Sequence, residues 1–213
     1  MRARSIFPAF LLGLLAFLVY RATAAPGLLP ADAGEFQLTL ARLGLSHPTG
    51  YPFYHLLGWL WDRLYLANPA QGANHFSALW GGVAVALVYL LLAEALGQLT
   101  ARLKWQGGAG WLAGIGALFF ALNPTFWAHA THAEVYTLHI ALIAGLLAAA
   151  LAAGREEEES PGRLWPVALL AGLSLTHHLT ALLLLPAVGL YLWMTASNRR
   201  RGARPLRLAA FVL

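Results

Sequence analysis

The sequence contains no cysteine among its 213 residues, which excludes disulfide bonds, thiolate nucleophiles and cysteine-ligated metal sites. Charged residues are also scarce: they make up 11% of the chain, against about 25% in an ordinary soluble domain. This scarcity excludes an ordinary soluble enzyme and a disordered chain. Hydrophobic residues make up 59%, in runs that approach the ~20 residues needed to cross a bilayer. The composition therefore predicts an all-α, polytopic membrane helix bundle.

The apolar runs predict where the membrane helices lie. They cover residues 5–20, 76–96, 109–122, 135–153 and 164–196. The first run follows two arginines and precedes small residues at 22–25, a pattern that also fits a cleaved signal peptide. The many later runs favour an uncleaved first helix. The last run is too long for one helix and short for two, so we expect a break near His177 and His178 at its middle.

Positive charges between the runs predict the orientation. Of the 14 lysines and arginines, 11 lie in residues 1–4, 100–106, 154–163 and 197–207. These segments all lie on one side of the membrane if the amphipathic stretch 53–66 does not cross it. Loops rich in lysine and arginine favour the cytoplasmic side. We therefore expect residues 22–73 to form a large first external loop that carries surface helices, with 53–66 at the membrane surface.

The end of the chain and its glycines carry two further predictions. Residues 208–213 are apolar and resemble the start of another span. We therefore expect residues 1–213 to be a single transmembrane domain, the N-terminal part of a longer module. Gly110 and Gly114 have the G-x-x-x-G spacing, which predicts a close approach between helices.

Two acids follow the first span closely. Asp32 and Glu35 come after Pro26 and Pro30, where we expect the chain to turn and begin a new helix. In a structural interpretation, Asp32 caps this helix and Glu35 fills the capping-box position three residues on. In a functional interpretation, a carboxylate points into a cavity as a general base or metal ligand. The sequence leaves both open.

A second polar group lies between two later runs, at residues 123–136. His129 and His132 share a face if this segment is helical, so they and Glu134 are candidate metal ligands. Glu134 also precedes the next predicted helix, where the helix dipole favours a carboxylate. A capping role and a ligand-binding role therefore stay open for Glu134.

Three further histidines are candidates for contact with an anion. His47 begins a turn at residues 47–52 that two prolines and a glycine make rigid. It either hydrogen-bonds this loop or faces a ligand phosphate. His177 and His178 either belong to one tilted helix or line a cavity that contacts an anionic lipid headgroup, because a polar break at membrane depth must be buried or wet.

Five short words of sequence occur in one order along the chain. They are Asp32-x-Gly34-Glu35-Phe36, Gly44-Leu45-Ser46-His47-Pro48-Thr49-Gly50-Tyr51-Pro52, Asn74-x-x-Ser77-Ala78-Leu79, Ala133-Glu134-Val135-Tyr136-Thr137-Leu138 and Gly172-Leu173-Ser174-Leu175-x-His177-His178. With these words the chain resembles the GT-C superfamily of integral-membrane glycosyltransferases. More narrowly, it is similar to a protein O-mannosyltransferase-like family long catalogued as a domain of unknown function.

The resemblance implies a GT-C-like bundle in the cell membrane and a polyprenyl-phosphate-linked sugar donor. The sugar, mannose in such a family, would pass with inversion to an acceptor hydroxyl of a protein or glycan on the non-cytoplasmic face. Asp32 would be the general base, and Glu35 would orient the acceptor or share that role. The implied substrate-binding residues are His47, Tyr51, Glu134, Tyr136, His177 and His178. A divalent cation, Mg²⁺ or Mn²⁺, would suit the carboxylates.

Two other classes of function stay open on the residues alone. A lipid or small-anion transporter or flippase also uses broken helices and intramembrane histidines. A non-catalytic membrane scaffold would tolerate replacement of the external acids. No feature of the sequence indicates a nucleic-acid partner, because the basic residues lie in short clusters between apolar runs.

Overall fold

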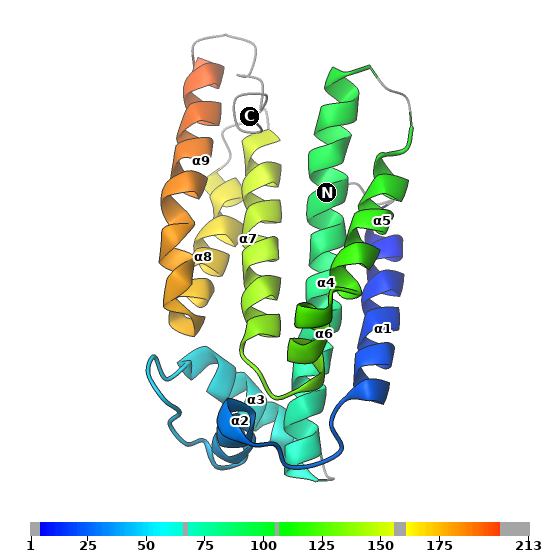
Figure 1. The fold of residues 1–213 in the computed structure, drawn as a ribbon. Coiled ribbons are helices and arrows are strands. Elements are labelled where there is room, and N and C mark those ends of the chain that lie inside the picture. The colour runs from blue at the N-terminus through cyan, green and yellow to red at the C-terminus, as the bar shows by residue number, and fades with distance from the viewer. Residues whose placement is uncertain (1–4, 66–67, 105–106, 156–160, 201–213) are drawn as a thin grey trace.

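The computed structural model describes residues 5–65, 68–104, 107–155 and 161–200, and every regular element in these ranges is helical. The α-helices are α1 (Ile6–Thr23), α2 (Ala31–Arg42), α3 (Pro52–Leu64), α4 (Pro69–Arg102), α5 (Ala109–Ala121), α6 (Pro124–Thr131), α7 (Tyr136–Arg155), α8 (Trp165–His177) and α9 (Leu185–Arg200). Two 3₁₀ helices, η2 (Pro161–Leu164) and η3 (Leu179–Leu183), flank α8. The predicted all-α helix bundle is confirmed (Figure 1).

Four helical segments in the described part of the chain are long and apolar enough to cross a membrane. They are Ile6–Thr23, Pro69–Ala101, Tyr136–Arg155 and Leu179–Ser197. These segments agree with the predicted runs 5–20, 76–96 and 135–153 and with the second half of 164–196. The protein is therefore membrane-embedded, as its composition indicates.

The predicted run 109–122 does not form a complete span by itself. α5 has 13 residues, about 20 Å of helix, which is shorter than a hydrocarbon core of about 30 Å. The chain bends by 65° after α5 and continues as α6, and only this bent pair together is long enough to cross. α6 occupies what we expected to be an open connection. The Asn123 side chain starts it by accepting the backbone N–H groups of Thr125 and Phe126.

α4 is the central helix of the bundle, with α1 and α5 along one side and α7 along the other (Figure 1). α1 and α4 approach most closely at two glycines: a Cβ built on Gly13 would lie 2.8 Å from the carbonyl oxygen of Gly82. The approach that we expected at Gly110 and Gly114 is absent from the described structure. A Cβ on Gly114 would meet nothing within 4 Å, and one on Gly110 only the Tyr89 hydroxyl at 3.8 Å.

The short helices α2 and α3 lie together at one end of the bundle (Figure 1). The same end holds the connection from α6 to α7 and the break between α8 and α9, whereas α4, α7 and α9 finish at the opposite end. The predicted segment 22–73 between two spans contains the short helices α2 and α3, and α4 already begins at Pro69. Predictions for residues 1–4, 66, 105–106, 156–160 and 201–213 lie outside the described residues.

The predicted break in the run 164–196 is also present. α8 ends at His177, and His178 has an extended backbone, with φ −150° and ψ 126°. η3 follows, and α9 then runs back beside α8 and α7 (Figure 1). The break places the two adjacent histidines at the end of the bundle that carries α2 and α3.

Candidate functional site

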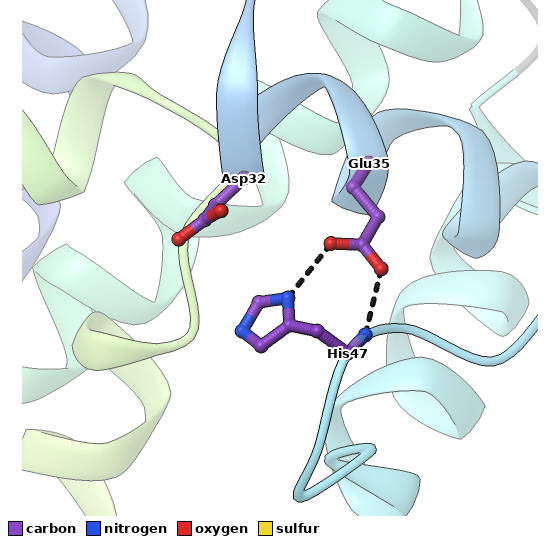
Figure 2. Close-up of side chains that lie close together, drawn as sticks. All are labelled: Asp32, Glu35 and His47. Carbon is purple, nitrogen blue, oxygen red and sulfur yellow. Dashed lines mark hydrogen bonds and ion pairs between the residues drawn. The ribbon is translucent and has the colours of Figure 1, made fainter.

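Asp32 and Glu35, the two acids after the first span, project from the start of α2. Pro30 occupies the N-cap position and makes no side-chain capping bond, so Asp32 does not cap this helix. Glu35 lies about one turn further, and both carboxylates point toward the imidazole of His47 (Figure 2). The structural interpretation of this pair as a capping box is therefore wrong.

Glu35 holds His47 by two contacts. One carboxylate oxygen accepts the backbone N–H of His47 at 2.7 Å, and the other pairs with ring Nδ1 at 2.7 Å (Figure 2). The hydrogen bond to His47 lowers the pKa of Glu35, and the same bond raises the pKa of His47. The turn 47–52 is thereby fixed to α2 by an ion pair.

Asp32, Glu35 and His47 are also the group that could hold a metal ion. Each offers one ligand atom, and the three atoms lie within 4.8 Å of one another. The two carboxylates suit Mg²⁺ or Mn²⁺, whereas an imidazole ligand is more typical of metals such as Zn²⁺.

The candidate ligands Glu134, His129 and His132 form no such group among the described residues. His129 lies on α6 with its ring 4.5 Å from that of Tyr136. His132 has left the helix, with φ −122° and ψ 156°, so the two histidines do not share a helix face as we expected.

Glu134 is placed by a polar side chain of α4. The Ser77 hydroxyl accepts the backbone N–H of Glu134 at 3.0 Å and donates to its carbonyl oxygen at 3.2 Å. Burial raises the pKa of the Glu134 carboxyl, and the negative charge of Asp32 raises it further. Asp32 and Glu134 therefore belong to two separate connections that lie at the same end of the bundle (Figure 1).

Asn74, which is fully buried on α4, explains why these two connections meet. Its side-chain oxygen accepts the backbone N–H of Ala133 at 2.9 Å and a side-chain N–H of Gln37, on α2, at 3.0 Å. Its amide nitrogen donates to the carbonyl oxygen of Ala25 at 2.8 Å. One side chain thus binds the chain after α1, the helix that carries Asp32, and the segment that carries Glu134.

The structural roles of Asn74, Ser77 and Gln37 were not predicted from the sequence. Asn74 and Ser77 were named only as members of one short sequence motif, and Gln37 was not named. Their signal was present: a buried amide or hydroxyl in an otherwise apolar surrounding needs a hydrogen-bond partner.

Tyr51 connects the acidic cluster to the break after α8. Its ring is buried and lies 5.6 Å from the ring of His47 and 5.6 Å from that of His178. The half-exposed ring of Tyr136 lies 6.2 Å from that of His178. The rings of four predicted substrate-binding residues, His47, Tyr51, His178 and Tyr136, therefore form one continuous group at this end of the bundle.

His177 has a different environment from its neighbour. Its side chain is 1% exposed, and its Nε2 lies 3.0 Å from the carbonyl oxygen of Val135. The ring therefore ties the end of α8 to the start of α7, directly behind Glu134.

Comparison with known proteins places the chain in a family. The sequence profile described as "Protein O-mannosyl-transferase TMEM260 N-terminal domain" matches residues 32–201. The chain is similar to "Protein O-mannosyl-transferase tmem260" of Dictyostelium discoideum, with 25% identity over 133 residues, 61% of this chain and 15% of that protein. It is also similar to "Protein O-mannosyl-transferase TMEM260" of Mus musculus, with 31% identity over 132 residues, 62% of this chain and 17% of that protein.

The chain spans about one sixth of the length of these curated relatives. No solved structure matches it. The matched residues 32–201 begin at Asp32 and include every word on which the predicted resemblance rests. The chain therefore belongs to the family of the protein O-mannosyl-transferase TMEM260 N-terminal domain.

Proposed function

We propose that this chain carries the catalytic end of a membrane glycosyltransferase of GT-C type. It would move a sugar, mannose by analogy with the names of its relatives, from a polyprenyl-phosphate donor to a hydroxyl of a protein or glycan acceptor. The observation that carries the proposal is the cluster of Asp32, Glu35 and His47 at one end of the bundle, where Asn74 ties α2 to the segment that carries Glu134. Because the relatives are much longer, we also propose that this chain is the N-terminal part of a longer membrane module.

Asp32 is the general base in this mechanism. It is exposed, whereas both oxygens of Glu35 are engaged by His47. A base must reach the proton that it removes. Asp32 takes the proton of the acceptor hydroxyl as that oxygen attacks the anomeric carbon. The bond from this carbon to the phosphate oxygen breaks on the opposite side, so polyprenyl phosphate leaves and the anomeric configuration inverts.

His47 and His178 act on the phosphate. The ion pair with Glu35 favours the protonated form of His47. A cationic imidazole stabilises the negative charge that develops on the leaving phosphate. Tyr51 and Tyr136 line the path between the two histidines. Glu35 acts by holding His47, and Glu134 binds the acceptor hydroxyl.

A divalent cation is the other use of this cluster. Asp32, Glu35 and His47 would hold it, and it would neutralise the phosphate in place of the imidazolium. The two arrangements exclude each other at His47, because an imidazolium carries a proton on both ring nitrogens and has no lone pair for a metal. Mg²⁺ or Mn²⁺ dependence of transfer therefore distinguishes them.

The location of the reaction follows from the basic residues. Arg102, Arg155 and Arg200 end α4, α7 and α9, and these helices finish at the end of the bundle opposite α2 and α3 (Figure 1). Under the positive-inside rule, that opposite end is cytoplasmic. We therefore propose that the site lies on the non-cytoplasmic side of the cell membrane.

The test is a transfer assay with the full-length protein in nanodiscs, supplied with labelled polyprenyl-phosphate mannose and a hydroxyl-bearing acceptor peptide. Mass spectrometry of the acceptor and NMR of the product anomer measure transfer and inversion. We expect Asp32→Asn to reduce transfer by about 100-fold or more while membrane insertion is kept. The matched control is Asp62→Asn on the surface helix α3, which should transfer normally. Unreduced transfer by Asp32→Asn would remove Asp32 from the mechanism.

The same nanodiscs test the transporter or flippase alternative. Its support is the broken pair α8 and α9 with histidines at the break. The names of the relatives do not favour it. Movement of a lipid-linked substrate across the bilayer without any change in its covalent structure would support the transporter and contradict the transferase.

A further inference from the structure

The break between α8 and α9 brings a third histidine next to His177 and His178. His139, on α7, has its ring centroid 4.7 Å from that of His178 and 5.9 Å from that of His177. Its Nδ1 is buried and without a hydrogen-bond partner in the described structure. An unpaired buried nitrogen costs free energy. The other ring nitrogen of His139, Nε2, is paired with the Thr180 hydroxyl.

Hydrogen bonds around Thr180 determine which nitrogen of each ring carries the proton. The backbone N–H of Thr180 donates to His178 Nδ1 at 3.3 Å, so this nitrogen has a lone pair and the proton is on Nε2. The Thr180 hydroxyl lies 2.8 Å from the same Nδ1 and donates to it as well. The hydroxyl oxygen then accepts the Nε2–H of His139 at 3.1 Å. The chain of donors therefore runs from His139 through Thr180 to His178.

This direction leaves His178 with one unused donor. Its Nε2–H lies on the side of the ring away from Nδ1, and no residue in the described ranges accepts it. The ring lies beside Tyr51 and Tyr136, which border the acidic cluster. A neutral imidazole N–H is a suitable donor to an anionic oxygen.

We propose that Thr180 and His139 are positioning residues that hold His178 in its Nε2–H tautomer, so that His178 donates a hydrogen bond to the phosphate of the lipid-linked donor. The phosphate half of this inference rests on the proposed function. The tautomer half rests only on the hydrogen bonds around Thr180.

The tautomer is tested without any donor. The full-length protein is labelled with ¹⁵N-histidine, placed in nanodiscs, and its ring nitrogens are measured by NMR. Loss of signals in His178→Gln and in His139→Gln assigns the two rings. We expect both rings to carry the proton on Nε2 and a lone pair on Nδ1. A proton on Nδ1 of His178 would overturn the proposal.

The phosphate contact is tested by kinetics with polyprenyl-phosphate mannose. We expect Thr180→Val to raise KM for the donor about tenfold with little change in kcat, because it releases one hydrogen bond that orients the ring. Thr180→Ser should restore KM. The matched control is Thr176→Val, since this exposed hydroxyl bonds only the Leu173 carbonyl of its own helix among the described residues.

The outcomes separate the two ideas. Equal KM values for Thr180→Val and Thr176→Val would overturn the role of Thr180. Absence of transfer in the wild-type protein would instead contradict the proposed function. The NMR measurement would still decide how His178 is held.

Discussion

The side-chain oxygen of Asn74 lies 2.9 Å from the backbone nitrogen of Ala133, although 59 positions separate the two residues in the chain. This bond, together with those from Asn74 to Ala25 and Gln37, brings the two acidic segments to one place. The site therefore depends on a residue that touches none of its reacting groups.

Replacement of this residue should damage both stability and transfer. Asn74→Ala leaves the buried side chain of Gln37 and the Ala133 N–H without their partner, and we expect a loss of about 3 kcal/mol in the free energy of unfolding. Denaturant unfolding in detergent measures this loss. The control is Asn68→Ala, which removes only the N-cap of α4 and should cost about 1 kcal/mol. Equal losses for the two variants would contradict the central role of Asn74.

The ion pair of Glu35 and His47 should give stability a defined pH dependence. The contribution of Glu35, whose pKa is lowered, is present above its ordinary pKa of 4.5 and is lost as the pH falls through the lowered pKa. The contribution of His47, whose pKa is raised, is present below its ordinary pKa of 6.5 and is lost as the pH rises through the raised pKa. The pair therefore stabilises the protein most between these two ordinary values.

The measurement is the difference in thermal midpoint between the wild type and Glu35→Gln from pH 4 to pH 9, roughly the range set by the ordinary pKa values. The contribution of the pair to the free energy of unfolding should be well below about 1 kcal/mol. The two side chains are 37% and 35% exposed, so solvent screens their interaction. Asp62→Asn should show no such maximum. A difference that keeps growing above pH 7 would contradict the assignment.

Glu134→Gln should reduce transfer without reducing stability. Burial and the charge of Asp32 raise the pKa of Glu134, so its ionised form opposes folding above pH 4.5. We expect the variant to be slightly more stable at neutral pH, with this gain lost in acid, and to transfer about 100-fold more slowly. The Ser77 contacts are made by the backbone and persist. Reduced stability with normal transfer would indicate a helix cap instead.

The glycines at the contact between α1 and α4 should tolerate no side chain. A Cβ on Gly82 would lie 2.6 Å from the Gly13 carbonyl oxygen and 2.8 Å from the Phe17 side chain. We expect Gly82→Ala to lower stability by about 1–3 kcal/mol because the helices must separate. Gly114→Ala, at a position with open space, is the matched control and should change stability little. Thermal unfolding in the same detergent compares them.

The sequence by itself determined where the helices lie and which residues are exceptional. Apolar length, prolines and charge act over neighbouring residues, so they revealed the spans, the break at His178 and the acids after the first helix. Asn123 and Pro124 also mark the end of α5 locally, but apolar length does not show that a helix resumes at Pro124.

Only the tertiary structure decided which of these residues meet. The bond of Asn74 to Ala133, the pair of Glu35 with His47 and the chain from His139 to His178 each join separate segments. The contact of Gly13 with Gly82 also joins two separate segments, α1 and α4. The G-x-x-x-G spacing had instead predicted a close approach at Gly110 and Gly114. The physical reason is that spacing within a helix defines a face, whereas packing against another helix decides what that face touches.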